Sequence, residues 1–471
     1  MKLKLWKSTC ISTFATFIVG CQSYEPVPLD IGSHRSSLDT RLFHIEPLSA
    51  FVERLDLLHD GDPATFDFSD GISPSEGEVI ALFYNPELRI ARLRAGASLA
   101  EFDTAGLWED PVFGYDGVDV TSPSAPFEFS IMGKITIPIS GRLSAEKERA
   151  GAAYEAQLRT IVDAEWQTRA VLRSHWAKWA AATERVALIA EVIVQLQKIN
   201  AIADMLVAAG ELNRVQHRLL QVELSSKMVE ATEIELQVLE ASFDLLDVMG
   251  LSPEAASMLI PTFPALELPH VEDETARLIA ANTLLAVRFA EYETAEKSLH
   301  VEIKKQFPDI VLRSGYGSEF NNHRVMFGLS IPLPVINANK AGIAIASANR
   351  EVARATAETT FAHLYRELAA ASITLQLKQS QRDHYEKTIV PMLEDQTRDI
   401  EKIVELGEVD TFILLETVSR QFDAKQQLIL LQLAELDAVI DVLRMYGPDS
   451  QMNPSPVHKD ISTERTLGGV Q

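Results

Sequence analysis

The sequence predicts an α+β membrane protein whose strands are too few to close a β-barrel within one chain. Three observations lead to this fold class. The N-terminus has a basic and apolar leader that ends at a cysteine, the chain repeats itself at a constant offset, and each repeat holds a pair of alternating strands followed by very long helical stretches.

The first twenty residues have the order of a signal peptide. Lysines precede the apolar run Ile11–Val19, which is too short to span a bilayer. The run Ile18-Val19-Gly20-Cys21 resembles a bacterial lipoprotein cleavage box. This resemblance implies that Cys21 becomes the first residue of the mature protein and carries diacylglycerol and an acyl chain. Gln22 fits release to the outer membrane. The alternative is an ordinary secretory signal with a chance cysteine.

Composition excludes several classes of function. The 471 residues include 43 Lys and Arg against 67 Asp and Glu, a formal net charge of −24. Such a surface repels nucleic acid and favours cations near any pore that it lines. Cys10 and Cys21 belong to the leader and its end, so we expect no disulfide and no bound cofactor. The mature chain has no run of eighteen uncharged apolar residues, so we expect no transmembrane helix, and a closed β-barrel is the remaining way to cross a bilayer.

An internal repeat organises the chain. The run Gly210-Glu211-Leu212-Asn213 matches the run Gly407-Glu408-Val409-Asp410, which lies 197 residues later. The offset slips to 194 only where Ile137-Pro138-Ile139 is answered by Ile331-Pro332-Leu333. The anchors at the main offset are Asn85 and Asn282, Pro111 and Pro308, Gly210 and Gly407, and Gly250 and Gly447. Several anchors at one offset indicate a duplicated chain.

The repeat predicts the domain boundaries. We expect a signal peptide at 1–20, a lipid-anchored linker at 21–76, the first copy at 77–252, a Pro-rich linker at 253–275, the second copy at 276–447, and a disordered polar tail at 448–471.

Each copy opens with a helical segment, 86–106 or 283–306, and continues with a predicted hairpin at 111–138 or 308–332. From Phe127 to Ile137, and again from Arg324 to Ile331, apolar and polar residues alternate. Such alternation gives an apolar face for lipid and a polar face for a water-filled lumen. A soluble antiparallel sheet with one face on a core is the alternative. Closed membrane barrels need about eight or more strands, so four strands per chain require an oligomer, and three copies would give twelve.

Long helices follow each hairpin, at 142–209 and 215–249 and then at 341–406 and 411–446. At 1.5 Å per residue the first would reach roughly 100 Å. Pro391 is expected to kink the third of these helices. A lipid-anchored coiled-coil stalk remains an alternative. A coiled-coil seam is predicted in the first helix by the spacing of Leu172, Trp179, Ala182, Val186, Ile189, Ile193 and Leu196.

Together these features resemble the TolC-type outer-membrane efflux channel family over about 77–447. The matching stretches are Asn85-Pro86-Glu87-Leu88, Ile331-Pro332-Leu333-Pro334 and Gln421-Phe422-Asp423-Ala424-Lys425-Gln426-Gln427-Leu428. Two further stretches look most like the heavy-metal-cation branch: Ala105-Gly106-Leu107-Trp108, and Phe307-Pro308-Asp309-Ile310 leading to Gly315-Tyr316-Gly317.

The resemblance implies a homotrimer with a twelve-stranded β-barrel in the outer membrane, continued by a long α-helical coiled-coil barrel in the periplasm. It implies a periplasmic adaptor and an inner-membrane pump, commonly proton-driven, as partners, and no chemistry in the channel itself. The adaptor would dock on two helix tips, formed by Gly210, Glu211 and Leu212 and by Gly407, Glu408 and Val409.

The resemblance also suggests a gate of acidic residues past the second tip. Glu416 lies where the outer acid is expected, whereas Ile413 replaces the inner one and Asp410 lies nearer the turn. The plainer interpretation of Glu416 is a solvated helix face.

Motifs of catalysis are missing from the sequence, which has no Gly-x-Ser-x-Gly, no His-Glu-x-x-His and no phosphate-binding loop with lysine. His175 and His323 are expected to be packed or exposed histidines, not metal ligands. Three alternatives to an efflux duct for metal cations or drugs stay open: a protein export channel, a periplasmic coiled-coil scaffold and an envelope hydrolase.

Overall fold

The computed structural model describes residues 24–43, 48–51, 71–119, 121, 127–320, 322–405 and 411–448. The chain divides into two units, Met1–Phe43 and His44–Gln471. In the described part of the first unit, helix α2 (Ile31–Thr40) begins where the Asp30 carboxylate accepts a hydrogen bond from the Ser33 N–H at 3.1 Å, and a 3₁₀ turn, η2 (Arg41–Phe43), follows it. Cys21 lies outside the described residues.

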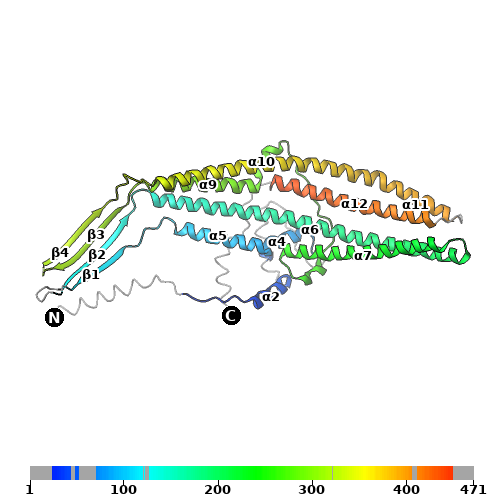
Figure 1. Cartoon of the computed structure of the whole chain (residues 1–471), viewed down its shortest axis with the longest axis horizontal. Coiled ribbons are helices and arrows are strands. Elements are labelled where there is room, and N and C mark those ends of the chain that lie inside the picture. Colours follow the sequence, from blue (N-terminus) through cyan, green and yellow to red (C-terminus); the bar gives the residue numbers. More distant parts are fainter. Residues whose placement is uncertain are drawn as a thin grey trace. The chain divides into compact units, whose positions relative to one another are not determined.

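The second unit holds long helices that run side by side and one sheet at their end (Figure 1). Its elements, in chain order, are α4 (Pro74–Tyr84), α5 (Pro86–Thr104), β1 (Val112–Val118), β2 (Glu128–Ile137), α6 (Arg142–Ala209), α7 (Arg214–Met249), η3 (Pro253–Met258), α8 (Glu274–Ala281), α9 (Thr283–Lys304), β3 (Ile310–Glu319), β4 (Asn322–Ser330), α10 (Lys340–His384), a π-helical turn η4 (Tyr385–Ile389), α11 (Val390–Glu405) and α12 (Thr411–Tyr446).

The four strands form one antiparallel sheet in the order β1-β2-β3-β4. Each hairpin pairs its own strands, and β2 joins β3 across the two halves of the chain, with Ile131 opposite Tyr316. The prediction of an α+β fold with four strands per chain is therefore confirmed. Among the described residues β1 and β4 have no strand on their outer sides, so the sheet has two open edges.

Two asparagines that the sequence comparison aligns make the same hydrogen bonds. Asn85 and Asn282 are the N-caps of α5 and α9, and each side-chain oxygen accepts the N–H of the residue three positions on at 3.0 Å. Each side-chain amide donates to a carbonyl near the end of a returning helix, Val248 at 2.8 Å and Met445 at 3.0 Å. These caps hold α5 against the end of α7, and α9 against the end of α12.

The core consists of seams between helices. One seam joins α6, α7 and α12 through Ile189, Leu196, Leu220 and Phe422 among others. Another joins α8, α9, α10 and α12. Of the predicted α6 seam, Leu172, Trp179, Ala182, Ile189 and Leu196 are buried, and Val186 and Ile193 are half-buried and pack against the first seam.

Helix also occurs within the segment that is expected to be a linker. Helix α4 begins at Pro74, inside the segment 21–76 that is expected to be a linker, and its N-cap Ser73 forms a capping box with Glu76. The π-helical turn η4 ends two residues before Pro391. A proline cannot donate a hydrogen bond to the preceding turn, so the wider turn accommodates the interruption that Pro391 was expected to cause.

No transmembrane helix is expected from the sequence, yet α6 contains an 18-residue window that is apolar enough to cross a membrane by length and composition. A third of that window is buried inside the chain. With 68 residues, α6 is far longer than the roughly 20 residues that cross a bilayer. Its apolar character is that of a helix that packs along α7 and α12.

Candidate functional site

The sheet has one apolar and one polar face, and the strand register sets which residues share each face. On one face Tyr115, Ile131, Tyr316 and Val325 lie side by side across the four strands. Large apolar side chains on this face are exposed; Phe327, for example, is 83% exposed. The opposite face carries glycines and charged or hydroxyl residues. A sheet with an exposed apolar face and no core beneath it is suited to lipid on that side and water on the other.

The open edges of this sheet are incompatible with an isolated membrane-inserted chain. Each edge strand leaves a row of backbone N–H and C=O groups without partners among the described residues. Such groups cost several kcal/mol each in a hydrocarbon environment. In a bilayer these groups would need hydrogen-bond partners from outside the four strands.

Helix α7 carries an apolar stripe on the side that faces away from its own chain. Its members recur every seven residues and are 45–69% exposed: Val215, Val222, Val229, Leu236 and Phe243. On the opposite side of the same helix, Leu220, Ile234 and Leu245 are buried. A heptad spacing of this kind is typical of a helix that packs against a second helix.

The turn between α6 and α7 contains the first predicted docking residues. Gly210 has a φ of 82°, and the Glu211 N–H donates to the Leu206 carbonyl at 2.9 Å, which ends α6 in a Schellman-type cap. Leu212 is half-buried and packs on the α6–α7–α12 seam, whereas Glu211 is exposed. Asn213 then starts α7 with a capping box. The turn is thus short, well ordered by hydrogen bonds, and presents one carboxylate outward.

The second predicted tip, Gly407 to Asp410, lies outside the described residues. Of the gate candidates the structure therefore places Glu416 alone. Its side chain is 61% exposed and accepts a hydrogen bond from Arg420, one turn along α12, at 2.6 Å. In the single chain this carboxylate has the arrangement of a solvated helix face.

A buried ion pair fixes the helical layer below the sheet. Arg92 on α5 donates to Glu165 on α6 at 2.8 Å, and their side chains are 4% and 9% exposed. The same guanidinium donates to the Leu82 carbonyl at 2.7 Å. Sequence reasoning missed this pair because Arg92 and Glu165 lie 73 positions apart on helices rich in charge, where no local pattern marks a buried residue.

Two titratable side chains are shifted by burial within the helical core. Burial, and then the hydrogen bond that the Tyr446 hydroxyl donates to Glu274 at 2.8 Å, raise the pKa of Tyr446 to about 12. Burial also lowers the pKa of His175, which lies beside the fully buried Trp176. The Nδ1 of His175 lies 3.8 Å from the Asp244 carboxylate on α7.

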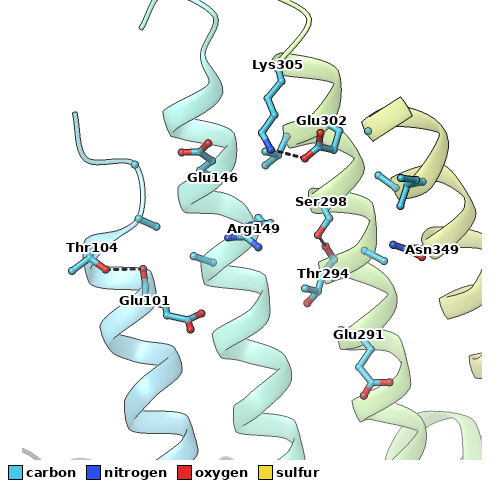
Figure 2. Close-up of a pocket in the computed structure, with 18 of the residues that line it drawn as sticks. Glu101, Thr104, Glu146, Arg149, Glu291, Thr294, Ser298, Glu302, Lys305 and Asn349 are labelled. Atoms are coloured by element: carbon cyan, nitrogen blue, oxygen red, sulfur yellow. Dashed lines mark hydrogen bonds and ion pairs between the residues drawn. The ribbon is translucent and has the colours of Figure 1, made fainter. Parts of the chain in front are cut away.

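A cavity of about 1070 Å³ lies between α5, α6, α9 and α10 (Figure 2). Its acidic side chains, Glu101, Glu146, Glu291 and Glu302, are exposed or half-buried. Lys305 donates to Glu302 at 2.6 Å, and this contact is the main cause that lowers the pKa of Glu302. The cavity has no buried acid pair, and within the described ranges no three His, Cys, Asp or Glu side chains are grouped to hold a metal ion. The side chains that line this cavity are those of a solvent-exposed groove between helices.

Known proteins resemble this chain in sequence and in fold. A family model described as outer membrane efflux protein matches residues 276–448. The cobalt-zinc-cadmium resistance protein CzcC of Cupriavidus metallidurans is 24% identical over 299 residues, which cover 62% of this chain and 70% of that protein.

Solved structures share the fold. CusC has a TM-score of 0.67 at 15% identity, covering 82% of this chain and 95% of its own. The outer membrane protein VceC of Vibrio cholerae has a TM-score of 0.68 at 15% identity, covering 79% and 96%.

Proposed function

Because the chain belongs to the outer membrane efflux protein family, whose members are non-enzymatic channels that act in tripartite systems, we propose that it is a passive exit duct closed by three copies. The observation that carries this proposal is the four-stranded sheet, with an apolar face, a polar face and two open edges. Three such sheets give a barrel of twelve strands, within the range of membrane barrels.

The apolar stripe on α7 supports the same assembly at the helical end. Val222 and Val229 are more than 60% exposed in the single chain. In a closed trimer a helix of the neighbouring copy would cover them, and the helices would continue the barrel as a periplasmic coiled-coil tube. The equivalent caps at Asn85 and Asn282 support a chain built from two copies of one unit, 77–252 and 276–447, joined by the Pro-rich linker 253–275.

The partners follow from the family and from the α6–α7 turn. We propose that a periplasmic adaptor docks on the tips at Gly210–Leu212 and at 407–409, and that an inner-membrane pump, commonly proton-driven, delivers the cargo. The ordered turn with Glu211 outward supports a docking surface at the first tip. Asp410 and Glu416 are proposed to line the narrow end of the duct, where three copies of a carboxylate would face each other.

The lipid anchor is proposed at Cys21, after a leader at 1–20 and ahead of the linker 21–76. Labelling cells with radioactive palmitate tests it: the wild-type protein should take up the label and the Cys21→Ser variant should not. Label that persists in the variant would rule out this anchor.

The cargo is proposed to be metal cations, supported by the resemblance to a cobalt-zinc-cadmium resistance protein. A strain that lacks the chain should become sensitive to divalent metals such as zinc, cobalt or cadmium, and the intact gene should restore resistance. Sensitivity to dyes and antibiotics instead would make drugs the cargo. A protein that is released from membranes by high salt and forms no heat-sensitive trimer in detergent would refute the channel itself.

A further inference from the structure

The polar face of the sheet separates its charges into two levels. At the level nearer the helices, Lys134 on β2 lies directly opposite Arg313 on β3. At the far end of the strands lie Asp116, Glu128 and Glu319, with Arg324 paired to Glu319. The cationic level therefore has no acidic residue in register with it, since its other two members are Val112 and Gly328.

No acidic side chain faces Lys134 and Arg313 at their own level of the sheet. Both are exposed, and across the described ranges neither side chain makes an ion pair or hydrogen bond. Gly328 next to Arg313 offers no side chain to cover it. Ser130, which is at the level of Asp116, is four residues from Lys134 along β2, or roughly 13 Å at the strand rise. This exceeds the Debye length of about 8 Å at physiological ionic strength, so the acidic level hardly offsets the cationic one.

Like charges directly opposite each other weaken a sheet. Within the described residues no hydrogen bond or ion pair compensates this repulsion. The arrangement is instead suited to act on a solute that passes along this face, where a low-dielectric wall strengthens the field of fixed charges.

We infer that Lys134 and Arg313 form a belt of positive charge around the lumen of the barrel and make it favour anions over free cations. This inference rests on the proposed function, because three copies would bring six cations to one level of a closed pore. It also differs from what the net charge of −24 suggests for a pore in this chain. A metal cargo would cross the belt most readily as an anionic or neutral complex, or together with anions.

The test measures the electrical potential inside the barrel through a single introduced thiol. In the Met132→Cys variant the thiol lies one level from the belt on the same face, and the mature chain has no cysteine other than Cys21. Reaction rates with an anionic and a cationic methanethiosulfonate are compared on whole cells. We expect the ratio of anionic to cationic rates to fall several-fold when Lys134→Ser and Arg313→Ser are added.

Two controls separate the belt from the barrel itself. The charge-keeping pair Lys134→Arg and Arg313→Lys should leave the ratio as it is, and Ile131→Cys on the apolar face should stay unreactive. A reactive Met132→Cys whose rate ratio is the same with and without the two serines would overturn the belt and leave the duct standing. An unreactive Met132→Cys would overturn the water-filled lumen, and the belt with it. Heat-sensitive trimers on gels verify that each variant has assembled.

Discussion

At the scale of single residues, the glycines that end the long helices differ in what a side chain would meet. Gly210 and Gly447 both have a positive φ, 82° and 69°. A Cβ at Gly210 would have no atom within 4 Å, whereas one at Gly447 would overlap the carbonyl oxygen of Ala281. The first glycine is required by backbone conformation alone, and the second also by the close approach of α12 to the turn before α9.

Alanine at the two positions should therefore lower the free energy of unfolding by different amounts. Gly210→Ala is expected to lower the free energy of unfolding by about 1 kcal/mol, the cost of the left-handed conformation. Gly447→Ala should cost about 3 kcal/mol or more because the backbone must also shift. Thermal unfolding in detergent, followed by circular dichroism, measures both. Gly210→Asn should be nearly neutral, and equal losses for the two alanines would contradict the expectation.

The buried pair of Arg92 and Glu165 gives a second prediction at this scale. Arg92→Met removes the ion pair with Glu165 and the hydrogen bond to the Leu82 carbonyl, so it should lower the free energy of unfolding by about 3–5 kcal/mol. The double variant with Glu165→Leu should recover most of this loss, because it removes both charges from the interior. A double variant that is as unstable as Arg92→Met would show that lost packing, and not the broken ion pair, causes the loss. Unfolding temperatures of the three proteins decide between these outcomes.

At the scale of elements, the end of α12 is tied to α8 by a titratable hydrogen bond. The pKa of Tyr446 is raised from 10 to about 12, so its contribution to stability is complete below pH 10 and is lost as the pH rises toward 12. Tyr446→Phe should cost about 1 kcal/mol at neutral pH. The difference between the two proteins should then shrink between pH 10 and 12. Unfolding temperatures across this range measure it.

Tyr365→Phe is the control for this pH dependence, because Tyr365 is 51% exposed on α10. Its stability should follow that of the wild-type protein over the whole range. A constant difference between Tyr446→Phe and wild type from pH 8 to 12 would mean that the Tyr446 hydroxyl does not control the alkaline loss.

Much of the fold could be predicted from the sequence because strong local signals mark the elements. Glycines at 210 and 250 end α6 and α7, and strict alternation marks β2 and β4. Helix α4 was missed, although Ser73 and Glu76 have the spacing of a capping box, because the residues before it lack periodicity. A π-helical turn, and not a sharp kink, precedes Pro391. Which of the two forms depends on how α10 packs, and the spacing of residues in the sequence does not show that packing.

The candidate site was less predictable than the fold. The apolar and polar strand faces follow from period-2 alternation, but the level at which Lys134 meets Arg313 depends on the register between two hairpins from different halves of the chain. The exposed heptad on α7 could have been found from Val215 onward, since its spacing is regular. Which of the two faces of α7 is buried within the chain, however, is decided by its contacts with α6.

At the scale of the whole molecule, the stripe on α7 predicts a variant that folds but fails to assemble. Val222→Glu places a carboxylate in the middle of the stripe, 65% exposed in the single chain. Buried without a partner in a trimer interface, it should shift the assembly strongly toward monomers. Size-exclusion chromatography with light scattering in detergent measures the mass.

The neighbouring Gln221→Glu adds the same charge beside the stripe, at an exposed position. It should remain a trimer. If Val222→Glu is trimeric as well, a neighbouring copy does not cover this part of α7, and the stripe faces some other surface.

The two open edges of the sheet come from opposite halves of the chain, β1 from the first and β4 from the second. In the proposed trimer the β1 strand of every chain therefore pairs with the β4 strand of a neighbour. The ring then has three such interfaces, one for each subunit. A mutant chain whose β4 cannot pair would still have a β1 that can pair. It could therefore assemble with a normal neighbour and leave one interface of the barrel open. Such an allele should therefore be dominant. Because an intact channel needs three normal subunits, the fraction of intact channels should equal the cube of the fraction of normal chains expressed.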